Sequence, residues 1–245
     1  VLPFGYTGTD VLNEVNLETV EGLKDSLLHL NQSGWLIFHR YIYLPPRAEL
    51  RLVATLNEAM RELGWEPAHH LAIFRTISTM IFLVSKQKWQ DEFSSLIQKY
   101  CDKMGYTPVY YPGMQIATAN LSNRLPNPIY AKAIRSLLTS PEKFLENSLF
   151  KLDPVYDNQP FFYYFLKWNH LVEIWQLFGY KWEALVEIGL LVPMAFVLVG
   201  GIALLLIGFP FFFKKRFSRT VSLSMFYFFF IGLGFMFIEI VLFEK

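Results

Sequence analysis

The apolar run Ile188–Phe213 constrains this chain more than any other stretch, because it contains no charged residue and ends abruptly at Lys214, Lys215 and Arg216. A helix rises about 1.5 Å per residue, so about 20 apolar residues are enough to cross the hydrocarbon core of a bilayer. A buried helix of a soluble protein rarely stays uncharged on every side over such a length. The run therefore predicts a membrane-spanning helix.

A second apolar run, Thr220–Phe243, follows after a short basic segment and contains one ionisable residue, Glu239. Two spans joined by so few residues predict an antiparallel helical hairpin within residues 184–245. An ionisable side chain inside a span is costly. Glu239 is therefore expected either to face protein or water as a functional site, or to reach toward the interface that Glu244 and Lys245 mark.

Composition divides the chain into a charged part and an apolar part. The whole chain is 53% hydrophobic with a net charge of +1, and most of its charged residues precede Ile188. That length suits one soluble domain followed by a membrane part. A near-zero charge with no basic block outside the inter-helix loop argues against a nucleic-acid partner. We therefore expect the lipid bilayer, and no nucleic acid, among the partners.

Periodicity predicts helices at residues 16–30, 48–63 and 90–104, and strands at 35–42, 71–77, 80–84 and 106–111. The strands at 71–77 and 80–84 are too close for a crossover helix, which predicts an antiparallel hairpin. The strand at 35–42 opens with four apolar residues, which suits burial on both faces of a parallel sheet. The order predicts an α/β fold: the C-terminal half of a Rossmann-like methyltransferase or spermidine-synthase sheet, its first half upstream of Val1.

The segment between this domain and the spans is rich in aromatic residues. Its apolar positions follow a helical stripe that consists of Trp168, Leu171, Trp175, Phe178 and Trp182. Tryptophan prefers the headgroup level of a membrane, so the stripe predicts a helix lying along the bilayer surface. The alternative is that the same stripe packs on the domain itself.

These observations divide the chain into three regions. Residues 1–150 are expected to form the C-terminal part of a Rossmann-like transferase domain. Residues 151–183 are expected to form an aromatic linker with an interfacial helix, and residues 184–245 two transmembrane helices. The chain reads as a fragment that works with upstream and downstream parts of the same polypeptide.

Five short stretches carry a resemblance that runs nearly end to end. They are Leu12-Asn-Glu14-Val-Asn-Leu-Glu-Thr19-Val20-Glu21, Asn31-Gln-Ser-Gly34, Tyr110-Tyr111-Pro112-Gly113, Asp157-Asn-Gln-Pro160-Phe161-Phe162 and Gly232-Leu-Gly234-Phe-Met-Phe-Ile-Glu239-Ile. In this order they resemble bacterial membrane-embedded spermidine-synthase-like proteins. That family joins a class I methyltransferase-like domain to transmembrane helices. Where the family tends to have Asp-Asp-Arg-Pro, this chain has Asp157-Asn158-Gln159-Pro160, and the loss of an acid and an arginine bears on its chemistry.

The resemblance implies a donor and a reaction. Relatives of the family use S-adenosylmethionine or decarboxylated S-adenosylmethionine, and they transfer a methyl or aminopropyl group to an amine or another nucleophile. Such transfer needs the sulfonium in line with an unprotonated nitrogen, and an acidic residue can accept the amine's proton. The resemblance places such acids in the loop at residues 4–16, where Asp10 and Glu14 are available.

Asp157 is a third candidate catalytic acid. Each candidate has a plainer interpretation: Glu14 lies upstream of a helix N-terminus, where the dipole favours negative charge, and Asp157 suits a turn acceptor. The glycine-rich turn and the ribose-binding acid of this fold belong to its first half, so cofactor-binding residues are expected upstream of Val1. His69 and His70 are adjacent without a second pair at ligand spacing, and no metal site is predicted.

Three functions remain open. The first is a membrane-tethered spermidine-synthase-like transferase, the second a catalytically inactive transferase-like protein with a binding or assembly role, and the third a transporter with an appended domain. The resemblance suggests the bacterial inner membrane, and a cytosolic cofactor favours a cytoplasmic domain. The four basic residues between Lys214 and Arg219 instead favour a cytoplasmic inter-helix loop, on the opposite side after a single crossing.

Overall fold

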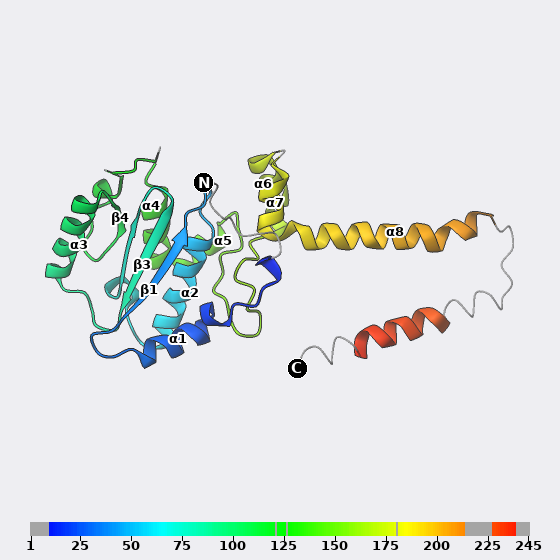
Figure 1. The fold of residues 1–245 in the computed structure, drawn as a ribbon, viewed down its shortest axis with the longest axis horizontal. Coiled ribbons are helices and arrows are strands. Elements are labelled where there is room, and N and C mark those ends of the chain that lie inside the picture. Colours follow the sequence, from blue (N-terminus) through cyan, green and yellow to red (C-terminus); the bar gives the residue numbers. More distant parts are fainter. Residues whose placement is uncertain (1–9, 121, 126, 180, 214–226, 239–245) are drawn as a thin grey trace. The chain divides into compact units, whose positions relative to one another are not determined.

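The computed structural model describes residues 10–120, 122–125, 127–179, 181–213 and 227–238, and it divides the chain into two compact units, Val1–Val192 and Pro193–Lys245. The helices of the first unit are α1 (Val20–His29), α2 (Ala48–Glu62), α3 (Asp91–Met104), α4 (Ile129–Thr139), α5 (Pro141–Glu146), α6 (Leu171–Phe178) and α7 (Trp182–Leu185) (Figure 1). The prediction of a mixed α/β domain is confirmed. The helices α4 and α5 were not predicted.

The first unit contains a four-stranded sheet in the order β1-β3-β2-β4. Its strands are β1 (Trp35–Tyr41), β2 (Leu71–Arg75), β3 (Thr79–Ser85) and β4 (Thr107–Tyr110). The predicted hairpin is confirmed, since β2 pairs antiparallel with β3, from Leu71 opposite Val84 to Arg75 opposite Met80. A mainly parallel sheet was expected, but all pairs among the described strands are antiparallel. Strand β3 lies between β1 and β2 and pairs with both, so these two strands are not direct neighbours.

Strand β1 differs from its predicted environment. Its side chains alternate between exposed and partly buried, and Trp35, Ile37 and Tyr41 are exposed. The expectation that this strand is buried on both faces was therefore wrong, because the described residues leave the face that carries Trp35, Ile37 and Tyr41 largely uncovered. The expectation would have suited β2, all of whose residues are buried.

The helices bury the faces that their apolar spacing predicts. In α1, Val20, Leu23 and Leu27 are buried, and α1 packs against α2, which in turn packs against α4. The first helix was predicted from residue 16, but α1 begins at Val20, and its N-cap is Thr19, whose Oγ1 accepts a hydrogen bond of 3.0 Å from the Gly22 backbone N–H. Asn16 instead begins a short 3₁₀ turn that leads into this cap.

The apolar helix α8 (Leu191–Phe213) follows a π-helical turn, Val186–Leu190. Within these elements, Val186–Leu206 is long and apolar enough to cross a membrane, and it is one such helix among the described residues. The apolar helix Tyr227–Ile238 is shorter than a span. The remainder of the second predicted span, including Glu239, and the basic inter-helix loop lie outside the described residues.

Candidate functional site

The carboxyl end of β1 is the place in the first unit where buried charged side chains gather. After Tyr41 the chain continues through Ile42, whose backbone N–H donates to Ser78 O over 2.9 Å, and then enters α2. Two clusters lie along this connection, one around the partly buried Arg40 and one around the buried Arg47.

The first group, named here the Arg40 cluster, consists of Glu18, Arg40, Phe162 and Tyr163. Arg40 Nη2 donates to Glu18 Oε1, and Arg40 Nη1 donates to the Tyr163 hydroxyl over 2.9 Å. The guanidinium carbon lies 5.5 Å from the centroid of the Phe162 ring. Glu18 Oε2 and Arg40 Nε are buried, with no hydrogen-bond partner among the described residues. The pair thus retains one unpartnered acceptor and one unpartnered donor.

The second group, the Arg47 cluster, surrounds a more deeply buried guanidinium. The Arg47 side chain is 5% exposed, and its Nη2 donates to Glu187 Oε2 over 3.0 Å. Three rings surround the guanidinium carbon: Tyr43 at 5.0 Å, Phe178 at 5.7 Å and Phe150 at 5.9 Å. Cation–π contacts and the ion pair together stabilise this buried charge. The cluster connects the start of α2 to α6 and to the π-helical turn.

Glu49 completes the Arg47 cluster from the first turn of α2. Its carboxylate accepts hydrogen bonds from the backbone N–H groups of Tyr43 and Arg47, the second over 3.1 Å. Burial raises the pKa of Glu49 from 4.5 to about 7, although these hydrogen bonds favour the ionised form. Because both oxygens face backbone donors, Glu49 orders the turn at residues 43–47 and presents no free oxygen to a ligand.

Arg51, two residues after Glu49 in α2, anchors the segment that supplies Phe162 and Tyr163. Its Nη1 donates to the carbonyl oxygens of Phe161, Phe162 and Tyr164, over 3.2, 2.9 and 2.7 Å. Burial lowers the pKa of Arg51 to about 10, so it stays protonated at neutral pH. These bonds fix the position of the aromatic side chains around Arg40.

The structure brings the predicted acidic residues into neighbouring segments. The Val15 N–H donates to Pro160 O over 2.8 Å, so the loop that carries Glu14 runs beside the loop that carries Asp157. Glu14 is exposed, whereas Asp157 Oδ1 accepts a bond of 2.6 Å from the Thr19 hydroxyl at the N-terminus of α1. Asp10 begins a short 3₁₀ turn, Asp10–Leu12, and its side chain lies outside the description.

Sequence reasoning missed Glu18, Arg40 and Arg47 as members of a site. One signal was present, since Arg40 interrupts an otherwise apolar strand pattern. A charged residue in such a place is buried with a partner or faces solvent, and the local sequence does not identify the partner. No group of three or more His, Cys, Asp or Glu side chains that could bind a metal occurs in the part of the chain that the structure describes.

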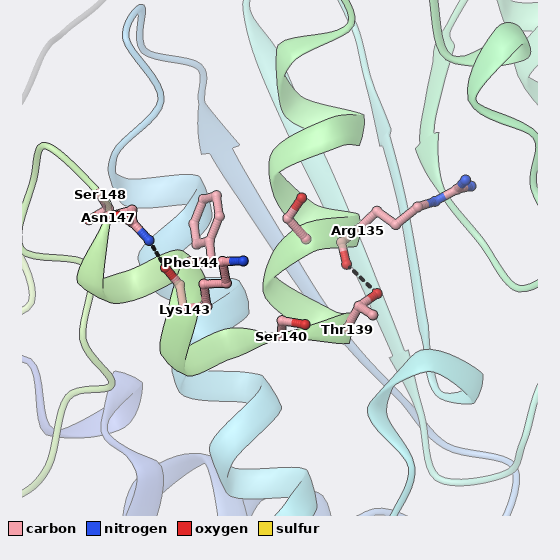
Figure 2. Close-up of a pocket in the computed structure, with 8 residues that line it drawn as sticks. Arg135, Thr139, Ser140, Lys143, Phe144, Asn147 and Ser148 are labelled. Carbon is pink, nitrogen blue, oxygen red and sulfur yellow. Dashed lines mark hydrogen bonds between the residues drawn. The ribbon is translucent and has the colours of Figure 1, made fainter.

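The two larger of the hollows given for the described residues lie away from these clusters. The larger, of about 550 Å³, lies between α4 and α5 and is lined by Arg135, Ser136, Thr139, Ser140, Lys143, Phe144, Asn147 and Ser148. Figure 2 shows that Thr139 and Asn147 turn their polar groups to carbonyls of their own helices, while the Arg135 side chain extends away from α5. The smaller, of about 380 Å³, is lined in part by Tyr110, Tyr111 and Arg135.

Neither hollow contains a residue of the Arg40 or Arg47 cluster. Arg135 reaches the second hollow because its Nη2 donates to Met114 O over 2.5 Å. Comparison of the chain with models of protein families, with curated proteins and with solved structures gave no match. The candidate site is therefore supported by the contacts and burial of its own residues alone.

Proposed function

We propose that the first unit is the C-terminal half of a Rossmann-like transferase domain, and that the strand arrangement carries this proposal. Because β1 and β2 both pair antiparallel with β3, they run parallel to each other, and α2 lies between them in sequence. Two parallel strands joined through a helix form the repeating unit of Rossmann-like sheets. The hairpin strand β3 then returns between them, as expected of a parallel sheet that ends in an antiparallel hairpin.

The exposed face of β1 supports the same proposal. Trp35 is 48%, Ile37 57% and Tyr41 43% exposed, so β1 presents large apolar side chains along one face. In a complete Rossmann-like sheet this strand is internal, and further strands and helices cover that face. The proposed upstream half would cover it and would carry the glycine-rich turn that binds the donor.

The activity that fits is group transfer at a membrane. An S-adenosylmethionine-type donor would lose its methyl or aminopropyl group to an amine: a C–N bond forms, the C–S bond breaks, and the thioether leaves. The amine's proton passes to an acceptor. Glu18 Oε2 suits this role better than the exposed Glu14, because it is buried at the carboxyl end of β1 and unpartnered among the described residues.

The test is donor binding and transfer by the protein extended upstream through the proposed first half of the sheet. We expect titration calorimetry to detect binding of S-adenosylmethionine or its decarboxylated form, and a labelled donor to transfer its group to a mixture of amines. Glu18→Gln should lower the rate about 100-fold or more at unchanged donor binding. Glu14→Gln is the matched control and should leave the rate near that of the unchanged protein.

A second function, binding or assembly without catalysis, is favoured by Asp157. Its carboxylate is engaged by Thr19, and its own backbone N–H donates to Glu21 Oε2 over 3.1 Å, so this acid supports the N-terminus of α1. Donor binding without transfer in the same experiment would favour this function. Absence of both would overturn the transferase proposal.

The proposed location is the bacterial inner membrane, with the first unit in the cytoplasm, where the cofactor is made. The length and apolar composition of Val186–Leu206 support the membrane part of this proposal. Impermeant labelling of a cysteine introduced at the exposed Lys132 tests the orientation. Labelling after lysis only supports a cytoplasmic domain, and labelling in intact cells contradicts it.

A further inference from the structure

Helix α6 and the turn before it expose large apolar side chains on one side. Trp168 is 57%, Val172 67% and Trp175 55% exposed. These residues are spaced i, i+4 and i+7, which places them together along a helical segment. The stripe predicted from the sequence divides between two faces, because Leu171 is partly buried and Phe178 is buried, and the side chain of Trp182 lies outside the description.

The inner face of α6 already packs on the first unit. Ile174 is fully buried, and Phe178 lies 6.1 Å from Phe150, centroid to centroid, and 5.7 Å from the Arg47 guanidinium. Trp168 and Trp175 therefore do not pack on the first unit as the alternative requires, because Ile174 and Phe178 form the contact of α6 with that unit. Their exposed face needs another partner.

The continuation of the chain indicates which partner. Helix α6 contacts α7, α7 contacts the π-helical turn Val186–Leu190, and this turn begins the apolar segment that reaches Leu206. The turn is anchored to the first unit, since the Phe165 N–H donates to Ile188 O over 3.1 Å and Arg47 pairs with Glu187. Within the first unit, the helix that carries Trp175 is therefore connected through α7 to the turn that precedes Leu191, the first residue of α8.

Tryptophan suits the headgroup layer because its ring is apolar and its N–H remains hydrated there. We propose that Trp168, Val172 and Trp175 insert into the headgroup layer of the membrane that α8 spans. The exposed Glu173 and Gln176 lie next to this surface and remain in water. The inference rests on the proposed membrane span, and the partner is a lipid surface.

The main experiment measures quenching of tryptophan fluorescence by brominated lipids, with the whole chain reconstituted in nanodiscs. The chain has six tryptophans, and variants retain one of them with the others changed to phenylalanine. We expect Trp168 and Trp175 to be quenched, more by bromines near the headgroup than by bromines near the methyl end. Trp35 is the matched control, because it is similarly exposed at 48% but lies on β1. Trp35 should not be quenched.

A reporter within α8 separates this inference from the membrane span. Phe196 is 80% exposed on α8, and Phe196→Trp in a tryptophan-free chain should be quenched by bromines along the acyl chain. If this reporter is quenched while Trp168 and Trp175 are not, the surface inference is overturned and the span stands. If the reporter is silent as well, the membrane span fails too. Equal quenching of Trp35 would also overturn the inference.

A second measurement avoids the multiple substitutions. A nitroxide on Val172→Cys, in a chain otherwise unchanged, should collide more with oxygen, which partitions into lipid, than with a water-soluble nickel complex. Cys101 is fully buried and should remain unlabelled. The same label on Lys132→Cys, an exposed position of α4, should show the opposite preference. Equal preferences at the two positions would overturn the inference.

Discussion

Among single residues, Glu49 gives a prediction about how the free energy of unfolding depends on pH. Burial raises the pKa of its carboxyl from 4.5 to about 7, so between these values the folded protein binds more protons than the unfolded chain. The free energy of unfolding should therefore fall as the pH rises through this window, and above about pH 7 the loss amounts to about 3 kcal/mol. Urea unfolding in detergent at about pH 5 and about pH 8 measures it.

Glu49→Gln should abolish most of this fall, because a glutamine side chain does not titrate. The exposed Glu14→Gln is the control, and its unfolding should retain the pH dependence of the unchanged protein. An equal pH slope in the Glu49→Gln variant would show that another group is responsible.

A further prediction concerns the stability effect of a side chain at Gly189, where the backbone is in the left-handed region. Its φ is 107°, and a Cβ built there would lie 2.8 Å from Cδ2 of Tyr164. Gly189→Ala should lower the free energy of unfolding by about 1–3 kcal/mol, because an L side chain is strained in this region and the ring must move. Gly105→Ala is the control, with a φ of 67° and open space around its Cβ. Its cost should be about 1 kcal/mol, and equal losses would contradict the contact with Tyr164.

At the scale of elements, the ion pair of Arg47 and Glu187 joins α2 to the π-helical turn before α8. Glu187→Gln leaves the buried guanidinium without its counter-charge, so the free energy of unfolding should fall by about 1–3 kcal/mol. Amide hydrogen exchange should also rise in the turn Val186–Leu190. The comparison is Glu62→Gln, which breaks an exposed pair with Lys24 and should not change stability measurably. Similar losses in both variants would argue against anchoring by Arg47.

At the scale of the whole molecule, the proposed transferase would bind its donor outside the described sheet. The sequence has no glycine-rich turn after a strand, and β1 is open on one edge among the described residues. The chain Val1–Lys245 alone should therefore show no binding of S-adenosylmethionine or its decarboxylated form in titration calorimetry. Micromolar binding of either compound would contradict the proposal that the upstream half carries the cofactor site.

The sequence by itself determined the elements in which the spacing of apolar residues shows which side of the element is buried. Apolar residues at helical spacing identified α1, α2 and α3, because one face of each helix meets the core. The short gap between two strand patterns identified the hairpin of β2 and β3, since it leaves no room for a crossover. The uncharged run identified α8, because a long run of apolar residues without a charge suits a helix that can cross a membrane.

Only the tertiary structure decided which elements are neighbours. Strand β3 separates β1 from β2, and no local pattern specifies the order of strands in a sheet. Arg40 meets Glu18, and Arg47 meets Glu187, from positions 22 and 140 residues apart. The acids chosen from sequence, Glu14 and Asp157, came from local motifs. The partly buried pair at the carboxyl end of β1 depends on packing between distant segments, because a charge leaves water only where the fold supplies its partner.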